Sequence, residues 1–191
     1  MLMNPFTRRA ESHLLAVSMT GVKMGDRVAF VGCAHGGRLA AIAAKVGLSG
    51  RAVAVVPDER AAALTQKGAE QAGVLVEIEL AAPTALPIEN NAIDLAVVDD
   101  TAGFLATISP ADRVAVIREL VRVLRPGGRV VVVGAGPVSG IARLVTRAPA
   151  AVSLTASGDV NAALAANGFS IVRTLAEREG LVFVEGIKPR A

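Results

Sequence analysis

The chain has 191 residues, of which 52% are hydrophobic, and its 20 basic and 17 acidic residues give a formal net charge of +3. This length allows one sizeable core and is short for two, so we expect residues 1–191 to form a single domain. The basic excess is small, and the chain has no Trp or Tyr and only five Phe, so it lacks the basic stripe and aromatic platform of a nucleic-acid-binding protein.

The single cysteine, Cys33, excludes an intramolecular disulfide and a multi-cysteine metal site, and the two histidines, His13 and His35, lie far apart in sequence. We therefore expect no bound metal and a reducing, cytoplasmic environment. The apolar stretch that follows Arg8 and Arg9 is interrupted by polar residues, unlike a signal peptide. No apolar run reaches the ~20 residues that span a bilayer, so we expect no membrane partner.

The first part of the chain alternates between helical and strand patterns. Uninterrupted runs of β-formers are typical of strands that are buried on both faces. Asp58 follows one of these runs and can provide the N-cap of the next helix. The predicted elements are a helix over 10–19, a strand over 27–31, a helix over 38–46, a strand over 52–56 and a helix from 59 to about 72.

The second part continues this alternation and then changes. Ser109, Pro110 and Asp112 form a helix start with an N-cap, a proline and an acid in the first turn. Only a short charged segment separates the last two strands, which is too short for a parallel crossover, so we expect them to be antiparallel. The predicted strands are 73–80, 95–98, 129–134, 169–173 and 181–187.

Together these elements predict an α/β fold. We expect a doubly wound, Rossmann-like, mixed seven-stranded sheet with a reversed C-terminal strand. Ligands of such sheets bind at the carboxyl ends of the strands.

Three segments of the sequence match the pattern of a known family. They are "LPIENNAIDLAVV" at 86–98, "LVRVLRPGGRVVVV" at 120–133 and "GLVFVEGIK" at 180–188. With them the chain resembles the class I S-adenosylmethionine-dependent methyltransferases, in the branch similar to the ubiquinone and menaquinone biosynthesis enzymes. The resemblance covers nearly all of residues 24–188. It implies S-adenosylmethionine as the cofactor and a small molecule as the methyl acceptor, and it leaves the oligomeric state open.

The loop "VGCAHGG" at 31–37 corresponds to the family's first motif. In such a strand-to-helix turn the first glycine permits the tight bend, and the amides that open the helix favour negative charge. In the family this charge is the methionine carboxylate of the cofactor. The resemblance therefore implies that Gly32, Ala34 and Gly36 bind the cofactor, with Ala34 standing in place of the middle glycine.

Three acids that the family uses to recognise the cofactor are replaced here by Phe30, Val56 and Ala82. A hydrogen bond to a charged group contributes about 1.5–3 kcal/mol, so we expect a degenerate site that binds S-adenosylmethionine weakly. Asp58 lies two residues beyond Val56, which keeps it on the same face of an extended chain. It is a candidate for the ribose contact, for the N-cap of the following helix, or for both.

Asp99 and Asp100 end a predicted strand, where the fold presents residues to its ligands. We expect Asp99 to contact the cofactor. A paired carboxylate there can also raise one pKa enough for general-base work, but solvated turn residues or a helix cap are the alternative. No catalytic residue is assigned.

Two other functions remain open from the sequence. The missing acids allow a non-catalytic binding or scaffold protein that retains the methyltransferase fold. The spacing of Gly32, Ala34 and Gly37 also satisfies the dinucleotide fingerprint of a nicotinamide-dependent oxidoreductase, although this signal is weak alone.

Overall fold

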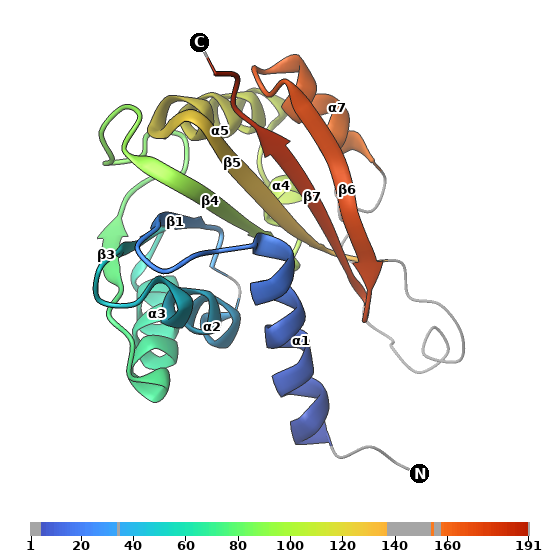
Figure 1. Cartoon of the computed structure of the whole chain (residues 1–191). Helices are drawn as coiled ribbons and strands as arrows, with labels where there is room; N and C mark the ends of the chain where they lie inside the picture. Colours follow the sequence, from blue (N-terminus) through green and yellow to red (C-terminus); the bar gives the residue numbers. More distant parts are fainter. Residues whose placement is uncertain (1–4, 34, 137–153, 155–157, 191) are drawn as a thin grey trace.

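The computed structural model describes residues 5–33, 35–136, 154 and 158–190, without the side chains of residues 5–12. Its strands form one seven-stranded sheet in the order β3-β2-β1-β4-β5-β7-β6 (Figure 1). The strands are β1 (Arg27–Val31), β2 (Arg51–Val56), β3 (Glu77–Leu80), β4 (Ile93–Asp100), β5 (Leu124–Ala135), β6 (Ile171–Arg178) and β7 (Leu181–Ile187). Neighbouring strands from β3 to β5 are parallel, whereas β7 is antiparallel to both β5 and β6. The predicted mixed sheet with a reversed C-terminal strand is confirmed.

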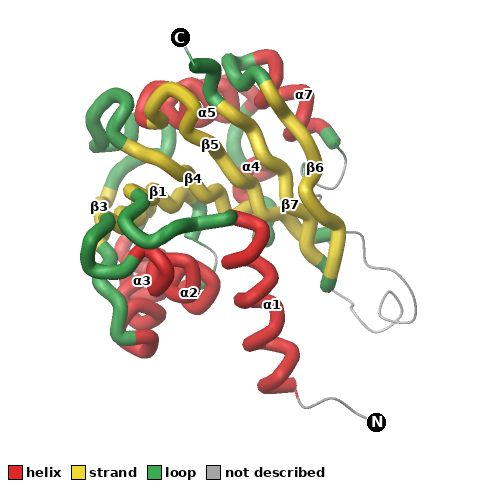
Figure 2. The backbone as a smooth tube through the Cα atoms, in the orientation of Figure 1, coloured by secondary structure: helices red, strands yellow, loops and turns green. Residues whose placement is uncertain are grey.

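Helices cover both faces of the sheet (Figure 2). One face carries α1 (Pro5–Thr20), α2 (Gly36–Val46) and α3 (Glu59–Ala72), and the other carries α4 (Phe104–Thr107), α5 (Pro110–Val123) and α7 (Asp159–Ala166). Side chains alternate between the faces of a strand. In β1, Ala29 and Val31 join the cluster beneath α5, whereas Val28 and Phe30 join the cluster beneath α2. Burial on both faces explains why β1 contains no polar residue after Arg27.

The segments that carry the family resemblance hold neighbouring elements together. Arg122 on α5 donates hydrogen bonds to the carbonyl oxygens of Leu86 and Ile88, each at 2.8 Å. Asp94 at the start of β4 accepts from the backbone N–H of Arg27 and from the side chain of Arg125. These polar contacts fasten the connection before β4 to α5, and they join β4 to β1 and β5.

Several element boundaries differ from the prediction for local reasons. The predicted strand 73–80 is reduced to β3, because Gly73 ends α3 in the left-handed conformation with φ 64°. Its N–H donates to the carbonyl of Glu70, and that of Val74 donates to Ala69, so these residues close the helix instead of extending the sheet. The "RPGG" segment lies inside β5 rather than before it, and the short helix α4 was not predicted.

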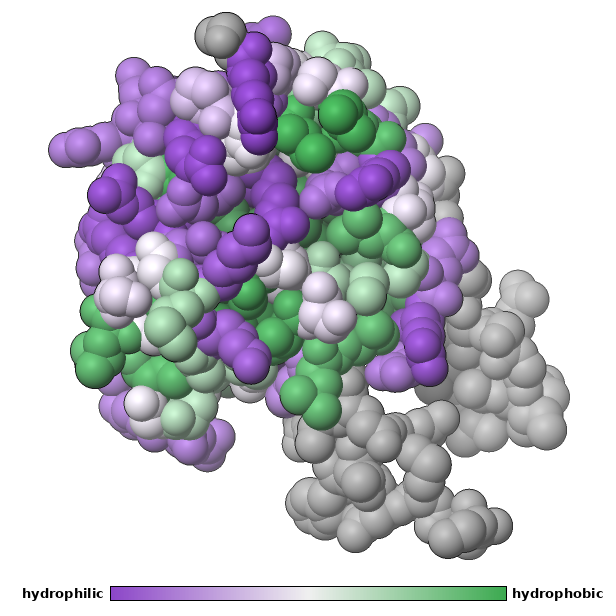
Figure 3. Space-filling view, viewed as in Figure 1, coloured by the Kyte–Doolittle hydropathy of each residue, from purple (hydrophilic) through white to green (hydrophobic). Residues whose placement is uncertain are grey.

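The outer surface is mixed in polarity. On the face seen in Figure 3, polar side chains interrupt the apolar areas. Among the helices that the structure describes, none combines the length and the apolar character needed to cross a bilayer.

Candidate functional site

The first glycine of the loop lies where three structural elements meet. Gly32 directly follows β1 and has φ 73°, a conformation that favours glycine. A Cβ atom on Gly32 would lie 2.9 Å from the carbonyl oxygen of Asp99 at the end of β4 and 3.1 Å from the ring of Phe104 on α4. Only a residue without a side chain fits this position, so Gly32 allows both the bend and the close approach of β4.

The helix that follows the loop opens without a side-chain cap. His35 occupies the N-cap position of α2 in an extended conformation, and its side chain makes no capping hydrogen bond. Its carbonyl oxygen accepts from the N–H groups of Arg38 and Leu39. The first-turn amides and the helix dipole make such a terminus favourable for an anion. Ala34, the predicted cofactor contact in the same loop, lies outside the described residues.

Gly36 serves helix packing in this structure. A Cβ atom on Gly36 would collide with the carbonyl oxygen of Leu64 on α3, and Gly68 of α3 lies against the same point. Gly36 is therefore required for the close contact between α2 and α3. Its predicted contact with the cofactor remains a prediction.

A buried ion pair joins α2 to the end of β4. Arg38 Nη1 lies 2.7 Å from Asp99 Oδ2, and the two side chains are only 9% and 11% exposed. Asp99 Oδ1 accepts hydrogen bonds from the backbone N–H and the hydroxyl of Thr101. Asp99 is thus an ordered residue of the site rather than a solvated turn residue.

Asp100 has a structural role next to this pair. It is fully buried, and its Oδ1 accepts from the N–H of Leu105 at 2.7 Å, near the start of α4. Because Asp99 and Asp100 both hold protein partners, the arrangement disfavours a general base at this position.

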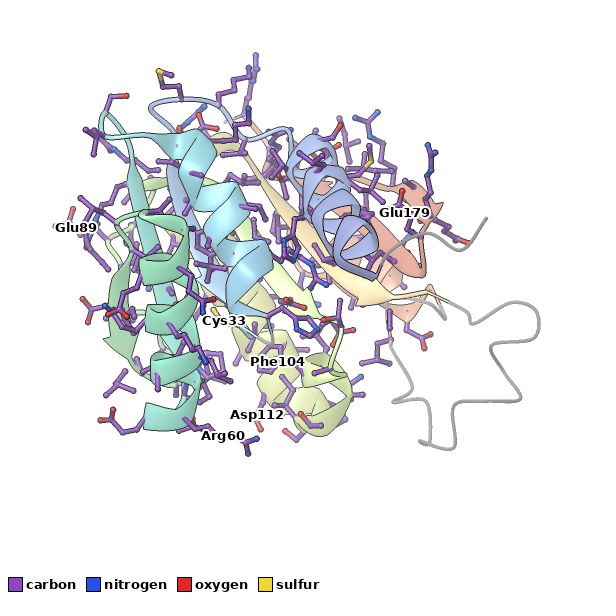
Figure 4. The ribbon with its side chains drawn as sticks, turned by 90° about the horizontal axis from the view of Figure 1, so that it is seen from below. Cys33, Arg60, Glu89, Phe104, Asp112 and Glu179 are labelled. Carbon is purple, nitrogen blue, oxygen red and sulfur yellow. The ribbon has the colours of Figure 1, made fainter. Side chains whose placement is uncertain are left out.

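Cys33 and Phe104 lie at the same end of the sheet (Figure 4). Cys33 is buried, and this burial raises the pKa of its thiol to about 12. The thiol is therefore neutral near pH 7 and is a packing residue, since the nucleophilic form is the thiolate. Phe104 is half-buried beside Gly32 and forms an apolar wall of the site.

The positions of the family's recognition acids are occupied by residues with other roles. Phe30 and Val56 are 3% and 0% exposed and belong to the apolar cluster beneath α2, whereas Ala82 is exposed. Asp58 accepts from the N–H of Ala61 at 2.8 Å, which confirms that it caps α3. A ribose contact by Asp58 remains a prediction.

Replacing Asp58 with alanine should lower the free energy of unfolding by about 1 kcal/mol, because the cap of α3 is lost. Ser109→Ala is the matched control, since Ser109 caps α5 in the same way: its hydroxyl oxygen accepts a hydrogen bond from the backbone N–H of Asp112. Chemical denaturation of both variants measures the contribution of the two caps to stability.

Titration with S-adenosylhomocysteine then tests whether Asp58 also contacts the ribose: about tenfold weaker binding in Asp58→Ala alone indicates a ribose contact. Unchanged affinity in both variants would leave Asp58 as a cap only.

Sequence reasoning missed Arg38, Thr101 and Phe104. A signal for Arg38 was present, because Arg38, Ile42 and Val46 lie four residues apart and are all buried on α2. A charged residue in such an apolar stripe requires a partner. The partner, Asp99, is 61 residues away in sequence, so only the fold identifies it.

A family model described as a methyltransferase domain matches residues 30–132, which include the glycine loop and extend into β5. The chain belongs to this methyltransferase family. The match confirms the predicted family and, with it, S-adenosylmethionine as the family's cofactor; it disfavours a nicotinamide-dependent oxidoreductase.

Individual relatives of this chain are distant or partial. A probable cobalt-precorrin-6B C(15)-methyltransferase (decarboxylating) from Saccharolobus solfataricus is 37% identical over 93 residues, which are 47% of this chain and 46% of that protein. The chain thus spans about half the length of this curated relative.

Two solved structures share the fold of this chain. One is a SAM-dependent methyltransferase from Aquifex aeolicus, with a TM-score of 0.75 and 17% identity over 97% of this chain and 99% of that chain. The other is the [4+2]-cyclase SpnF, with a TM-score of 0.68 and 18% identity over 95% and 81%. At this level of identity the likeness concerns the fold alone.

Proposed function

We propose that this protein transfers a methyl group from S-adenosylmethionine to a small-molecule acceptor, through a cofactor site that has lost part of the family's recognition set. The observation that carries the proposal is Gly32, which bends tightly between the ends of β1 and β4 and leads into the uncapped N-terminus of α2. A small-molecule acceptor is supported by the partial relative, whose name describes a precorrin methyltransferase.

The residues present fit one end of the cofactor better than the other. The amino-acid end requires donors for a carboxylate, and the loop offers the first turn of α2 and the buried guanidinium of Arg38. At the nucleoside end, Val56 and Ala82 provide no carboxylate, and Asp58 is the candidate that remains. We therefore propose Gly32, Asp58 and Asp99 as cofactor contacts, with weak binding overall.

When bound, the cofactor supplies an electrophilic methyl group on a sulfonium centre. The contribution of this chain would be mainly orientation and exclusion of water, which can provide a large share of a rate enhancement. Phe104 presents its ring beside the loop and restricts solvent there. Asp99 and Asp100 are engaged by protein partners, so neither is proposed as a general base for the acceptor nucleophile.

A second candidate is a non-catalytic binding or scaffold protein. It is favoured by the complete burial of apolar side chains at positions 30 and 56, where the family has acids. The cyclase among the structural neighbours also indicates that this fold hosts chemistry other than methyl transfer.

Calorimetric titration with S-adenosylmethionine and S-adenosylhomocysteine tests the first candidate. A methyltransferase should bind both ligands, and both should raise its melting temperature, because a ligand that binds only the native state stabilises it. No heat and no thermal shift with either ligand at millimolar concentration would contradict methyl transfer and favour the scaffold.

A further inference from the structure

We propose that Arg38 and Asp99 together recognise the amino-acid end of the cofactor and so replace the carboxylate that is missing at position 30. The inference rests on the proposed function and names the residue pair that makes the altered site selective. It concerns binding only, and no covalent bond forms or breaks.

The first observation is an unused donor on Arg38. The Arg38 side chain is 9% exposed, and its Nη1 atom donates to Asp99 and Thr101. Its Nε–H is buried and finds no hydrogen-bond acceptor among the residues that the structure describes. A buried donor without an acceptor is costly, so the position of Arg38 is best explained if a ligand supplies the acceptor.

The second observation is where this donor lies. Arg38 lines a small cavity together with Phe30, Cys33 and Asp99. Cys33 belongs to the loop before α2 and Arg38 to the first turn of α2, where backbone amides also favour an anion. The cavity itself is only about 10 Å³, so a carboxylate would lie at its edge, against the guanidinium and the first turn of α2.

The third observation is that the missing acid has a substitute on the neighbouring strand. Phe30 of β1 pairs with Val97 of β4, and both belong to the cluster beneath α2. Asp99 lies two residues beyond Val97 and so returns to the same face of the sheet. Its carboxylate lines the same cavity as the Phe30 side chain. The negative charge of this region therefore comes from β4 instead of β1.

The chemistry of the pair matches a zwitterion. An α-amino acid end carries a carboxylate and an ammonium group. Arg38 Nε and the α2 amides can donate hydrogen bonds to the carboxylate, and Asp99 can accept a hydrogen bond from the ammonium group. A carboxylate has about four lone-pair sites, so Asp99 retains capacity beyond its bonds to Arg38 and Thr101. A nucleoside without the amino-acid end would gain nothing from the pair.

The test compares S-adenosylhomocysteine with 5′-methylthioadenosine, which lacks the amino-acid end. By calorimetry, the wild-type protein should bind S-adenosylhomocysteine at least about tenfold more tightly. The double variant Arg38→Met with Asp99→Asn removes both charges without leaving either one unpaired. It should lose about tenfold in affinity for S-adenosylhomocysteine and retain its affinity for 5′-methylthioadenosine.

Two further variants keep the result interpretable. Arg51→Met with Glu77→Gln removes an ion pair between β2 and β3, away from the cavity, and should change neither affinity. Arg38→Lys keeps a positive charge near Asp99 but removes the Nε donor. It should show the same selective loss with little change in melting temperature, which decides the question if the double variant does not fold.

The outcomes separate the two proposals. Two outcomes overturn the role of the pair and leave methyl transfer intact. One is an equal loss of affinity for both ligands in the double variant. The other is unchanged affinity for S-adenosylhomocysteine in both Arg38→Lys and the double variant. A wild-type protein that binds neither ligand overturns both.

Discussion

Replacing Gly36 with valine should lower the free energy of unfolding by about 3 kcal/mol or more. Overpacking a well-packed interior typically costs about 1–3 kcal/mol, and the cost rises when backbone atoms must move. Here the added Cβ would meet the Leu64 carbonyl oxygen and the Cα of Gly68, so α2 and α3 would have to separate. The shift should be measurable by urea denaturation without any ligand.

Gly37 offers a matched control for this prediction. A Cβ atom on Gly37 would lie 2.9 Å from Cε1 of His13, which is the far end of a side chain and not backbone. We therefore expect Gly37→Ala to cost much less than Gly36→Ala. If Gly36→Ala were as stable as the wild type and only lost S-adenosylhomocysteine binding, the glycine would serve the ligand rather than the helix contact.

Replacing Val56 with aspartate should destabilise the protein in the absence of ligand by about 3 kcal/mol or more, because an ionised group without a partner would enter the apolar cluster beneath α2. Val56 is fully buried at the end of β2. An acid at this position would strengthen ligand binding through the ribose hydroxyls if Asp58 does not already make that contact. The burial of Val56 adds a folding cost to that gain.

The neutral variant Val56→Asn separates charge from shape. Both variants should melt below the wild type, with the aspartate variant lower at pH 7. Saturating S-adenosylhomocysteine should then stabilise the aspartate variant more than the wild type, if the acid reaches the ribose. An aspartate variant as stable as the wild type without ligand would show that position 56 is open to water.

The fold was predictable because its signals are local. The β-formers of β1 and β2 indicated strands buried on both faces, and the short charged segment before Leu181 indicated the antiparallel hairpin. Asp58 was recognised as an N-cap for the same reason, since its acceptor role depends on a residue three positions away.

The site was less predictable because its decisive contacts join distant segments. Gly32 and Phe104 are far apart in sequence, and so are Arg38 and Asp99. The glycine motif indicated where the chain bends, but not which residues lie against the bend. Gly36 illustrates the limit: its place in the motif predicts a ligand contact, which stays a prediction, but gave no sign of the packing contact with α3 that the structure shows.

The two edge strands of the sheet affect whether copies of this chain can associate edge to edge. β3 and β6 are the edge strands, and an edge strand exposes backbone groups that can recruit a strand from another molecule. Glu77 and Glu79 lie on β3, and Arg173 and Arg178 lie on β6. Two copies that met through β3 would bring like charges together. Charge on β3 therefore disfavours the pairing of two copies through this edge.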